Sequence, residues 1–295
     1  MQNYPRRTDL AVESAVGGTA ARGITHRTDS SSGFEVTTVI IGTGEGAALA
    51  GKPLGRYVTV GTDRLLRRGD GAFAAAAGVI AGELRGLLAL SETDSVLVAG
   101  LGNPAIAADS VGALSCDSVL ATAHLVETEP ERFGFFRRVY AERPGVVGST
   151  GVESSRAVKA LAAELKPDRV IVIDALSSLS PARVCRTVQL TDAGIVPGSG
   201  VGNSRPRISR ETLGIPVIAI GVPTVIDAET LARDLLGRAG LEDFDLPDGA
   251  FGENLIVTPR DIDAAAASAA KLIGYAINLA LHSGLTADDV TALLG

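Results

Sequence analysis

The chain has 295 residues, enough for one large α/β domain or two smaller ones, and 46% of them are hydrophobic. Aromatic residues make up only 4% and there is no Trp, so parallel strands between Ala-rich helices are favoured over a β-sandwich. The net charge of −7 argues against direct nucleic-acid binding, and two cysteines are too few for a disulfide framework or a thiolate zinc site.

The first 33 residues are rich in Arg, Thr, Ser, Gly and Asp, so we expect them to be loosely structured. The clearest loop signal in this region is the polar run at 27–33. The N-terminus lacks the apolar core of a secretory signal, and we expect a cytoplasmic protein.

Residues 36–41 and 57–60 are expected to be strands because they are β-branched and apolar. The Gly-Thr-Gly-Glu-Gly run at 42–46 resembles a dinucleotide-binding fingerprint. Gly51 and Pro53 leave little room for the helix that such a motif needs. We therefore expect a loop between the two strands.

The middle of the chain alternates between helical and strand patterns. We expect a helix over 71–90, a strand over 96–100 and a helix over about 109–125. The run at 150–153 matches a capping box that would open a helix to about 165. Residues 170–173 are expected to form the next strand.

Strands are expected again at 184–190 and 216–220, separated by a long Gly-rich loop, and a helix at 227–237. The acidic stretch at 240–253 is expected to be a surface insertion. This alternation predicts an α/β fold, with a mainly parallel sheet flanked by helices on both faces. We see no convincing linker and expect a single domain with a mobile N-terminal segment.

The C-terminal helix is expected to be capped by Thr258, with Pro259 in its first turn. Residues 264–281 are apolar but contain Ser, Lys and Asn, so they indicate a packed helix and not a membrane span. Thr286 is expected to open a short last helix by the same capping logic.

Two aspartates are the first candidates for chemistry. Asp174 directly follows a run of four apolar residues, and Asp109 follows shortly after the apolar strand at 96–100. A carboxylate at the end of a buried parallel strand faces the crevice where such sheets bind ligands. An aspartate in such a place often only caps a helix or holds a loop. If the two converge, they could share a proton, polarise a water or hold a metal.

The Gly-rich loop at 194–203 is a second candidate site. The residues that we expect to contact a bound substrate are Gly198, Ser199, Gly200, Gly202 and Asn203. The backbone amides could cradle an anion or lie against an extended peptide. The glycines could equally be needed for positive φ angles in a loop. The sequence leaves both interpretations open.

Several motifs, in this order, together resemble the germination protease (spore protease) family of endospore-forming bacteria. They are Arg7-Thr8-Asp9-Leu10-Ala11-Val12-Glu13, Gly100-Leu101-Gly102-Asn103, Pro144-Gly145-Val146-Val147-Gly148, Val172-Ile173-Asp174-Ala175-Leu176, Pro197-Gly198-Ser199-Gly200-Val201-Gly202-Asn203 and the stretch from Leu213 to Val225. The resemblance extends to residues 254–259 and the helix beyond.

The resemblance implies an atypical aspartic endopeptidase that begins the degradation of small acid-soluble spore proteins during germination. It implies a self-processing zymogen, a homotetramer and a fold related to hydrogenase maturation proteases, with no cofactor. The family's two catalytic aspartates correspond to Asp109 and Asp174. One carboxylate would activate water while the other, protonated, would act as the acid.

The resemblance also implies a cleavage site in the N-terminal segment. Family substrates are cut after an acidic residue and before an apolar residue, Ala, a small residue and Glu. Residues 8–13 fit that form, so we expect self-cleavage between Asp9 and Leu10, with residues 1–9 as a propeptide and 10–295 as the catalytic domain. The alternative is an ordinary disordered tail.

Two other functions compete with this interpretation. The related maturation proteases bind a metal through two acidic residues and a histidine, so Asp109, Asp174 and His124 could be ligands in a metal-assisted peptidase. The second alternative is a non-enzymatic module that binds a ligand through the loop at 194–203.

Overall fold

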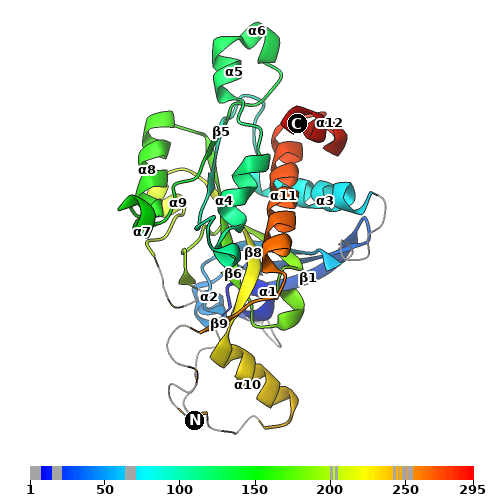
Figure 1. Ribbon diagram of the computed structural model, residues 1–295, viewed down its shortest axis with the longest axis vertical. Coiled ribbons are helices and arrows are strands. Elements are labelled where there is room, and N and C mark those ends of the chain that lie inside the picture. Colours follow the sequence, from blue (N-terminus) through cyan, green and yellow to red (C-terminus); the bar gives the residue numbers. More distant parts are fainter. Residues whose placement is uncertain are drawn as a thin grey trace.

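The computed structural model describes residues 8–14, 22–63, 71–199, 202, 205–241, 244, 246–247, 251 and 255–295 (Figure 1). Its helices are α1 (Ala11–Ser14), α2 (Gly44–Ala50), α3 (Ala72–Leu88), α4 (Val111–Ser115), α5 (Ala123–Thr128), α6 (Pro130–Phe133), α7 (Val147–Thr150), α8 (Ser154–Leu165), α9 (Arg210–Leu213), α10 (Ala228–Arg238), α11 (Ile262–Leu281) and α12 (Ala287–Leu294). Short 3₁₀ turns are η3 (Ala107–Asp109), η4 (Cys116–Ser118) and η5 (Pro181–Arg183).

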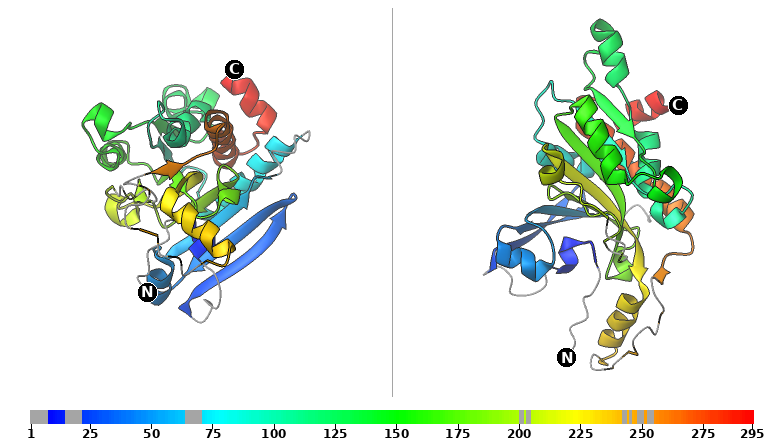
Figure 2. Two further views of the ribbon diagram at one scale, coloured as in Figure 1. Left: turned by 60° about the horizontal axis from the view of Figure 1, so that its bottom comes forward. Right: turned by 90° about the vertical axis from the view of Figure 1, so that its left-hand side faces the viewer.

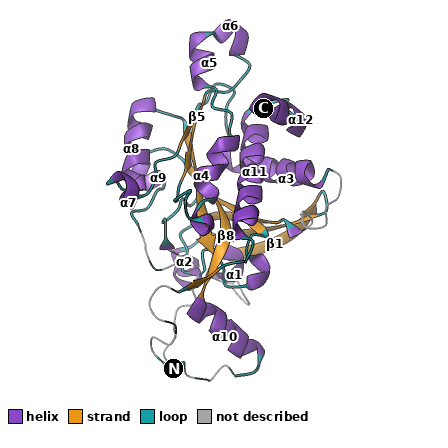
Figure 3. Cartoon of the chain, viewed as in Figure 1, coloured by secondary structure: helices purple, strands orange, loops and turns teal. Residues whose placement is uncertain are grey.

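The strands of the described residues form one mixed sheet (Figure 3). They are β1 (Ile24–Ser31), β2 (Phe34–Ile41), β3 (Gly55–Gly61), β4 (Val96–Gly100), β5 (Val139–Glu142), β6 (Arg169–Ser177), β7 (Thr187–Thr191), β8 (Val217–Asp227) and β9 (Ile256–Val257). Their order is β1-β2-β3-β7-β8-β6-β4-β5, with β9 paired to β8.

The sheet has a parallel half and an antiparallel half. Strands β5, β4, β6 and β8 run parallel to one another. Asp174 lies on β6 of this half, and Asp109 follows β4 in the chain. Strands β1, β2, β3 and β7 join it antiparallel through β8. The expected α/β class is confirmed, and the expected parallel pairing holds for the half beside the aspartates.

Side chains of β4 and β6 are buried on both faces of the sheet, as a parallel strand between helices requires. On β4, Val96 and Val98 belong to the core under α3 and α11, whereas Leu97 and Ala99 belong to a second core with α8. Helices therefore cover both faces (Figure 2). Because successive side chains point to opposite faces, a register slip of one residue would exchange the two cores.

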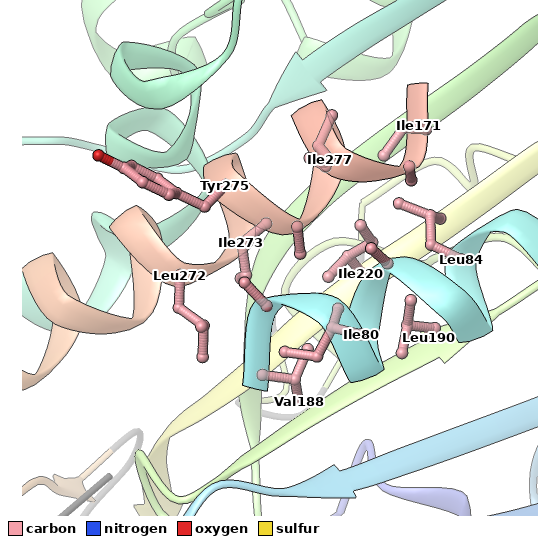
Figure 4. Packing of buried hydrophobic residues seen from close by; sticks show 14 of the residues in the cluster. Ile80, Leu84, Ile171, Val188, Leu190, Ile220, Leu272, Ile273, Tyr275 and Ile277 are labelled. Carbon is pink, nitrogen blue, oxygen red and sulfur yellow. The ribbon is translucent and has the colours of Figure 1, made fainter. Parts of the chain in front are cut away.

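Helix α11 is the long element of the first core. Its Ile273 and Ile277 lie among Ile80 and Leu84 of α3 and the side chains of the strands beneath (Figure 4). The helix is long and apolar enough to cross a membrane by length and composition alone, but most of it is buried inside the protein. The predicted packed helix is therefore what the structure contains.

A glycine lets α4 lie directly on the backbone of the strands. A Cβ atom at Gly112 would be 2.3 Å from the carbonyl oxygen of Ile173 and 2.4 Å from that of Leu101. The amide of Leu101 also donates to the carbonyl of Ile173, at 2.8 Å. Because Asp109 precedes this contact and Asp174 follows Ile173, the contact brings the two aspartates toward one edge of the sheet.

Two local predictions for the first 60 residues are wrong. Most of the predicted loop at 27–33 is part of β1, whose hydrogen bonds come from pairing with β2 although most of its side chains are exposed. The predicted loop after β2 contains helix α2, capped by the hydroxyl of Thr43. Since β2 and β3 are antiparallel, the parallel β-α-β context of a dinucleotide motif is still absent.

The helix predicted over 109–125 is broken into η3, α4, η4 and α5. The break after η4 has a tertiary cause, because the side chain of Asn278 on α11 bonds this backbone. Its Oδ1 accepts from the amide of Leu120 at 2.9 Å, and its Nδ2 donates to the carbonyl of Ser118 at 2.7 Å. These bonds replace the helical bonds that the hydrophobic pattern predicted.

The expected caps have mixed outcomes. Thr150 ends α7 instead of opening α8, which begins after Glu153. Thr258 donates to the carbonyl of Thr224 at 2.8 Å, and α11 begins only at Ile262. Thr286 does cap α12, through a capping box with Asp289. Much of the predicted insertion at 240–253 lies outside the described residues.

Candidate functional site

Both candidate aspartates line one cleft with a volume of about 260 Å³. Asp109 and Asp174 reach it from η3 and β6, and Asp9 of the N-terminal segment lines it too. The walls are mostly apolar, and include Leu101, Ile106, Val146, Val147, Leu176 and Val225. The two aspartates, whose convergence the sequence left open, therefore line the same cleft.

Asp174 lies within β6, whose pairing with β8 continues past it to Ser177. Its side chain is almost fully buried, with 5% of the residue exposed, and its Oδ1 accepts from the amide of Ala175 at 2.9 Å. Burial raises the pKa of this carboxyl well above its usual 3.8, and the charges of Asp109 and Asp9 raise it further. Asp174 therefore holds a proton at pH values where exposed aspartates have lost theirs.

Asp109 is the last residue of η3 and is half-buried. Its Oδ2 accepts from the amide of Asn103 at 2.8 Å, and its own amide donates to the carbonyl of Ile106 at 2.8 Å. Burial raises the pKa of Asp109, while the bond from Asn103 opposes that rise. The two carboxyls in the cleft thus differ in burial, and the more buried Asp174 keeps its proton to higher pH than Asp109 does.

The raised pKa of Asp174 predicts a pH dependence of stability with a defined sign. The folded state binds this proton more tightly than the unfolded chain does, so the stabilisation is complete below pH 3.8 and is lost as pH rises through the folded pKa. The variant Asp174→Asn removes the ionisation. We expect the free energy of unfolding of Asp174→Asn to exceed that of the parent by an amount that increases from pH 4.5 to pH 7.5. Urea titration at each pH measures this difference.

The matched control is Asp94→Asn, at an exposed carboxyl whose pKa is lowered by hydrogen bonds from Ser91. Its stabilisation is present above the unfolded pKa of 3.8 and is lost as pH falls through the lower folded pKa, so the stability difference between this variant and the parent should stay nearly constant from pH 4.5 to pH 7.5. A stability difference between Asp174→Asn and the parent that stays constant with pH would contradict the prediction.

The N-terminal segment lies at the same edge of the cleft. The amide of Asp9 donates to the carbonyl of Ser177 at 2.9 Å, and the amide of Ser177 donates to Asp9 Oδ2 at 2.8 Å. Ser199 Oγ donates to Asp9 Oδ1 at 2.7 Å. The next residue, Leu10, is fully buried. The predicted cleavage bond therefore starts at a residue that is held beside both candidate aspartates.

The Gly-rich loop contributes to this arrangement in part. Gly198 lines the cleft, and Ser199 holds Asp9 as described. The amide of Gly202 donates to the carbonyl of Ser199 at 3.3 Å. Gly200 and Asn203 lie outside the described residues.

His124 does not join the two aspartates. It lies near the start of α5, exposed, and lines a separate pocket with Tyr140 and Leu161. Within the described ranges, no group of three or more His, Cys, Asp or Glu side chains is arranged to hold a metal ion. The ligand set named for a metal-assisted peptidase is therefore not assembled.

Sequence reasoning missed two polar side chains, one on the antiparallel half of the sheet and one between α2 and β3. Gln189 on β7 donates from Nε2 to the carbonyl of Asp9 at 3.1 Å and accepts from the amide of Ala11 at 2.8 Å. Lys52, which follows α2, donates from Nζ to the carbonyl of Thr8 at 2.6 Å. Burial lowers the pKa of Lys52 although Asp9 and Glu13 lie near it.

The sequence did carry a signal for one group that was overlooked. Residues 177–180 read Ser-Ser-Leu-Ser and begin at the last residue of the strand of Asp174. Small polar residues after a buried strand leave backbone amides available for anions. The amide of Ser177 is one of them, since it binds the carboxylate of Asp9.

Known proteins resemble this chain over nearly its whole length. The family model for germination protease matches residues 9–238. A germination protease of Clostridium perfringens is 36% identical over 99% of both chains, and one of Caldanaerobacter subterraneus subsp. tengcongensis is 37% identical over 98% of both. A germination protease of Bacillus subtilis is 34% identical over 98% of this chain and 96% of its own.

Among solved structures, a [NiFe] hydrogenase maturation protease HycI from Thermococcus kodakarensis KOD1 covers 66% of this chain and 99% of its own. The identity is 17% and the TM-score is 0.38, so this likeness carries no functional weight. The sequence relatives carry the assignment instead, since both the family model and the full-length matches agree. The chain belongs to the germination protease family and is a peptidase.

Proposed function

We propose that this protein is an endopeptidase in which Asp109 and Asp174 act as a general acid–base pair. One observation carries the proposal: two carboxyls of raised pKa line the cleft beside which the Asp9-Leu10 peptide begins. Buried carboxyls with perturbed pKa values are typical of catalytic sites. Two such groups in one cleft share a proton more readily than they both ionise.

The difference in burial suggests which carboxyl has which role. Asp109, the less buried, would be ionised and accept a proton from a water molecule as that water's oxygen attacks the scissile carbonyl carbon. Asp174, the more buried, would donate its proton to the carbonyl oxygen. When the tetrahedral intermediate collapses, the C–N bond breaks and the leaving amine takes the proton held by Asp109. The hydroxyl that becomes the new carbonyl returns its proton to Asp174, which restores the starting state of the pair.

The natural setting follows from the family. We propose that the substrates are small acid-soluble spore proteins, that the enzyme begins their degradation during germination, and that it works in the spore core. The names of the full-length relatives support germination as the setting. We also propose a homotetramer, for which the half-exposed apolar residues Leu255, Ile256 and Val257 at the edge strand β9 offer a contact surface.

The N-terminal segment is proposed to be processed by the enzyme itself. Residues 1–9 would be the propeptide and 10–295 the catalytic domain. The bonds that hold Asp9 at the cleft support this assignment, because they place an acidic residue before a buried apolar one next to the two aspartates. Cleavage would therefore fall between Asp9 and Leu10.

Mass spectrometry of the intact protein tests the proposed cleavage. After incubation at mildly acidic pH, where Asp174 keeps its proton, we expect loss of residues 1–9 and a new N-terminus at Leu10. The control is Arg27→Gln, at an exposed residue of β1 whose guanidinium forms an ion pair with Asp29 on the same strand. It should be processed at the parent rate. Release of any other fragment would count against the assignment.

A further inference from the structure

Gln189 is a buried polar residue in the middle of β7, with 5% of it exposed. Its neighbours Val188 and Leu190 belong to the hydrophobic core under α3. Because side chains alternate along a strand, Gln189 points to the opposite face of the sheet. The amide of Ala11, the first residue of α1, reaches it there. The side-chain amide of Gln189 is therefore enclosed between the sheet and the N-terminal segment.

The side chain of Gln189 spans the proposed cleavage bond. Its Nε2 donates to the carbonyl oxygen of Asp9 at 3.1 Å, and its Oε1 accepts from the amide of Ala11 at 2.8 Å. The carbonyl of Asp9 is the group that a water molecule would attack to break the bond between Asp9 and Leu10. One side chain thus binds the oxygen of the scissile carbonyl and the second amide after it.

The direction of the Gln189 amide group is fixed by these two partners. A backbone N–H can only donate and a backbone carbonyl can only accept. The reverse orientation would place Nε2 against the N–H of Ala11 and Oε1 against the carbonyl of Asp9, leaving four polar groups unpaired. The donor is therefore aimed at the scissile carbonyl before any reaction begins.

Asp9 borders two cavities, and the reactive groups reach it from both. Asp109 and Asp174 line the cleft described above, whereas Gln189 lines a second cavity of about 400 Å³. Asp9 and Leu176 line both. A water held by the two aspartates can therefore attack the carbonyl carbon from the cleft while Gln189 keeps its bond to the carbonyl oxygen.

A donor in this place matters most during the attack. When the oxygen of water bonds to the carbonyl carbon, the C=O double bond opens and its electron pair moves to the carbonyl oxygen. A fixed N–H group that already points at this oxygen stabilises the negative charge without having to reorient. A carbonyl oxygen has two lone pairs, so it can accept from Gln189 and also receive the proton of Asp174.

We propose that Gln189 is a catalytic residue, whose side-chain N–H stabilises the negative charge that develops on the oxygen of the scissile carbonyl. The inference rests on the proposed function, and it assigns substrates the same contacts with Gln189 that the enzyme's own segment makes. If Gln189 only tethered the N-terminal segment, its loss would free the cleft, and added peptides would be cut as fast as before or faster.

The first test compares the parent with Gln189→Met on a synthetic peptide that copies residues 4–17. Met has nearly the shape of Gln and no N–H donor. We expect kcat to fall about 100-fold, the usual effect of removing one such donor. KM should rise by about tenfold at most, because hydrogen bonds between neutral groups contribute little to binding. The initial rates are measured over a range of peptide concentrations.

The second test changes the peptide instead of the protein. L-Lactate replaces the residue copied from Ala11, so an ester oxygen stands where the amide N–H was, while the scissile bond stays an amide. The Oε1 of Gln189 then has no donor. We expect the parent to lose about tenfold in kcat/KM with this peptide, whereas Gln189→Met should cut both peptides at similar rates.

Thr187→Val is the matched control. Thr187 is buried on β7 two residues before Gln189, and its hydroxyl donates to the carbonyl of Arg183 at 3.2 Å. The variant loses a buried hydrogen bond of the same strand and should keep the parent's kcat and its preference between the two peptides. Urea titration of each variant checks that it is folded.

The outcomes separate this inference from the proposed function. A parent-like or higher kcat in Gln189→Met refutes the catalytic role while the peptidase assignment stands. The same holds if the ester costs both proteins equally, or if Thr187→Val loses as much activity as Gln189→Met. If the parent cuts neither peptide, the proposed endopeptidase function fails and the role of Gln189 falls with it.

Discussion

Asp174→Asn and Asp109→Asn should each reduce peptide cleavage by about 10³-fold while leaving the protein folded, since general acid–base groups contribute about 10²–10⁴-fold. In the first variant the amide cannot supply the proton, and in the second it cannot accept one from water. The readout is the initial rate on the peptide copying residues 4–17, with self-cleavage followed separately by mass spectrometry.

A carboxylate outside the cleft serves as the control for this pair. Asp117 on η4 forms an exposed ion pair with Arg143 at 2.8 Å, so Asp117→Asn should cut at the parent rate. If either cleft variant cuts as fast as the parent, the assignment of that aspartate is wrong. A loss in one variant only would point to a single catalytic carboxyl.

The second large effect is expected at Gly102, which carries no functional group. Its φ is +94°, and a Cβ atom there would lie 2.0 Å from the carbonyl oxygen of Asp109 and 2.9 Å from its Oδ1. Gly102→Ala must therefore displace Asp109. Since a misplacement of 1 Å can cost about 100-fold in rate, we expect cleavage to fall by about that factor.

Gly214→Ala is the matched control for Gly102→Ala. Gly214 also has a positive φ, of +79°, but a Cβ atom there would have no neighbour within 4 Å. It should lose about 1–2 kcal/mol of stability from backbone strain and keep its activity. Comparison of kcat/KM in conditions where both variants are folded isolates the effect on Asp109. Parent-like activity in Gly102→Ala would contradict the steric argument.

The apolar runs were the most reliable guide to this fold. Strands β4 and β6 are buried on both faces, so their central residues are apolar runs. Strand β4 was predicted where it occurs, whereas β6 was predicted only over 170–173 and continues past Asp174 to Ser177. The two aspartates could be chosen as candidates because one of those runs ends at Asp174. Which carboxyl is the more buried could not be predicted, because it depends on how the loops of other elements close over the cleft.

The errors came from contacts between distant residues. The side chain of Asn278 ends the helical path near Ser118, and Thr258 bonds Thr224 instead of a helix end. Strand β1 has a sequence typical of a loop and is a strand only because β2 lies beside it. Periodicity and capping patterns describe local preferences, and here tertiary hydrogen bonds overrule them.

The same limit explains why the surroundings of Glu13 were not found from the sequence. Its distant hydrogen-bond donors are two backbone amides and a serine hydroxyl, from a stretch that resembles any polar loop. Their function depends on Glu13, which lies more than 160 residues away in the chain. Only the fold brings the acceptor and the donors together.

The close approach of Gly112 to Ile173 and Leu101 has a mechanical consequence for the aspartate pair. The main chain of α4 contacts the main chain of the strand segments there with no side chain between them. The segments that carry Asp109 and Asp174 are therefore in direct backbone contact. Thermal fluctuations that shift this edge of the sheet carry both carboxyls along as one body. We therefore expect their separation to change little when other parts of the protein move.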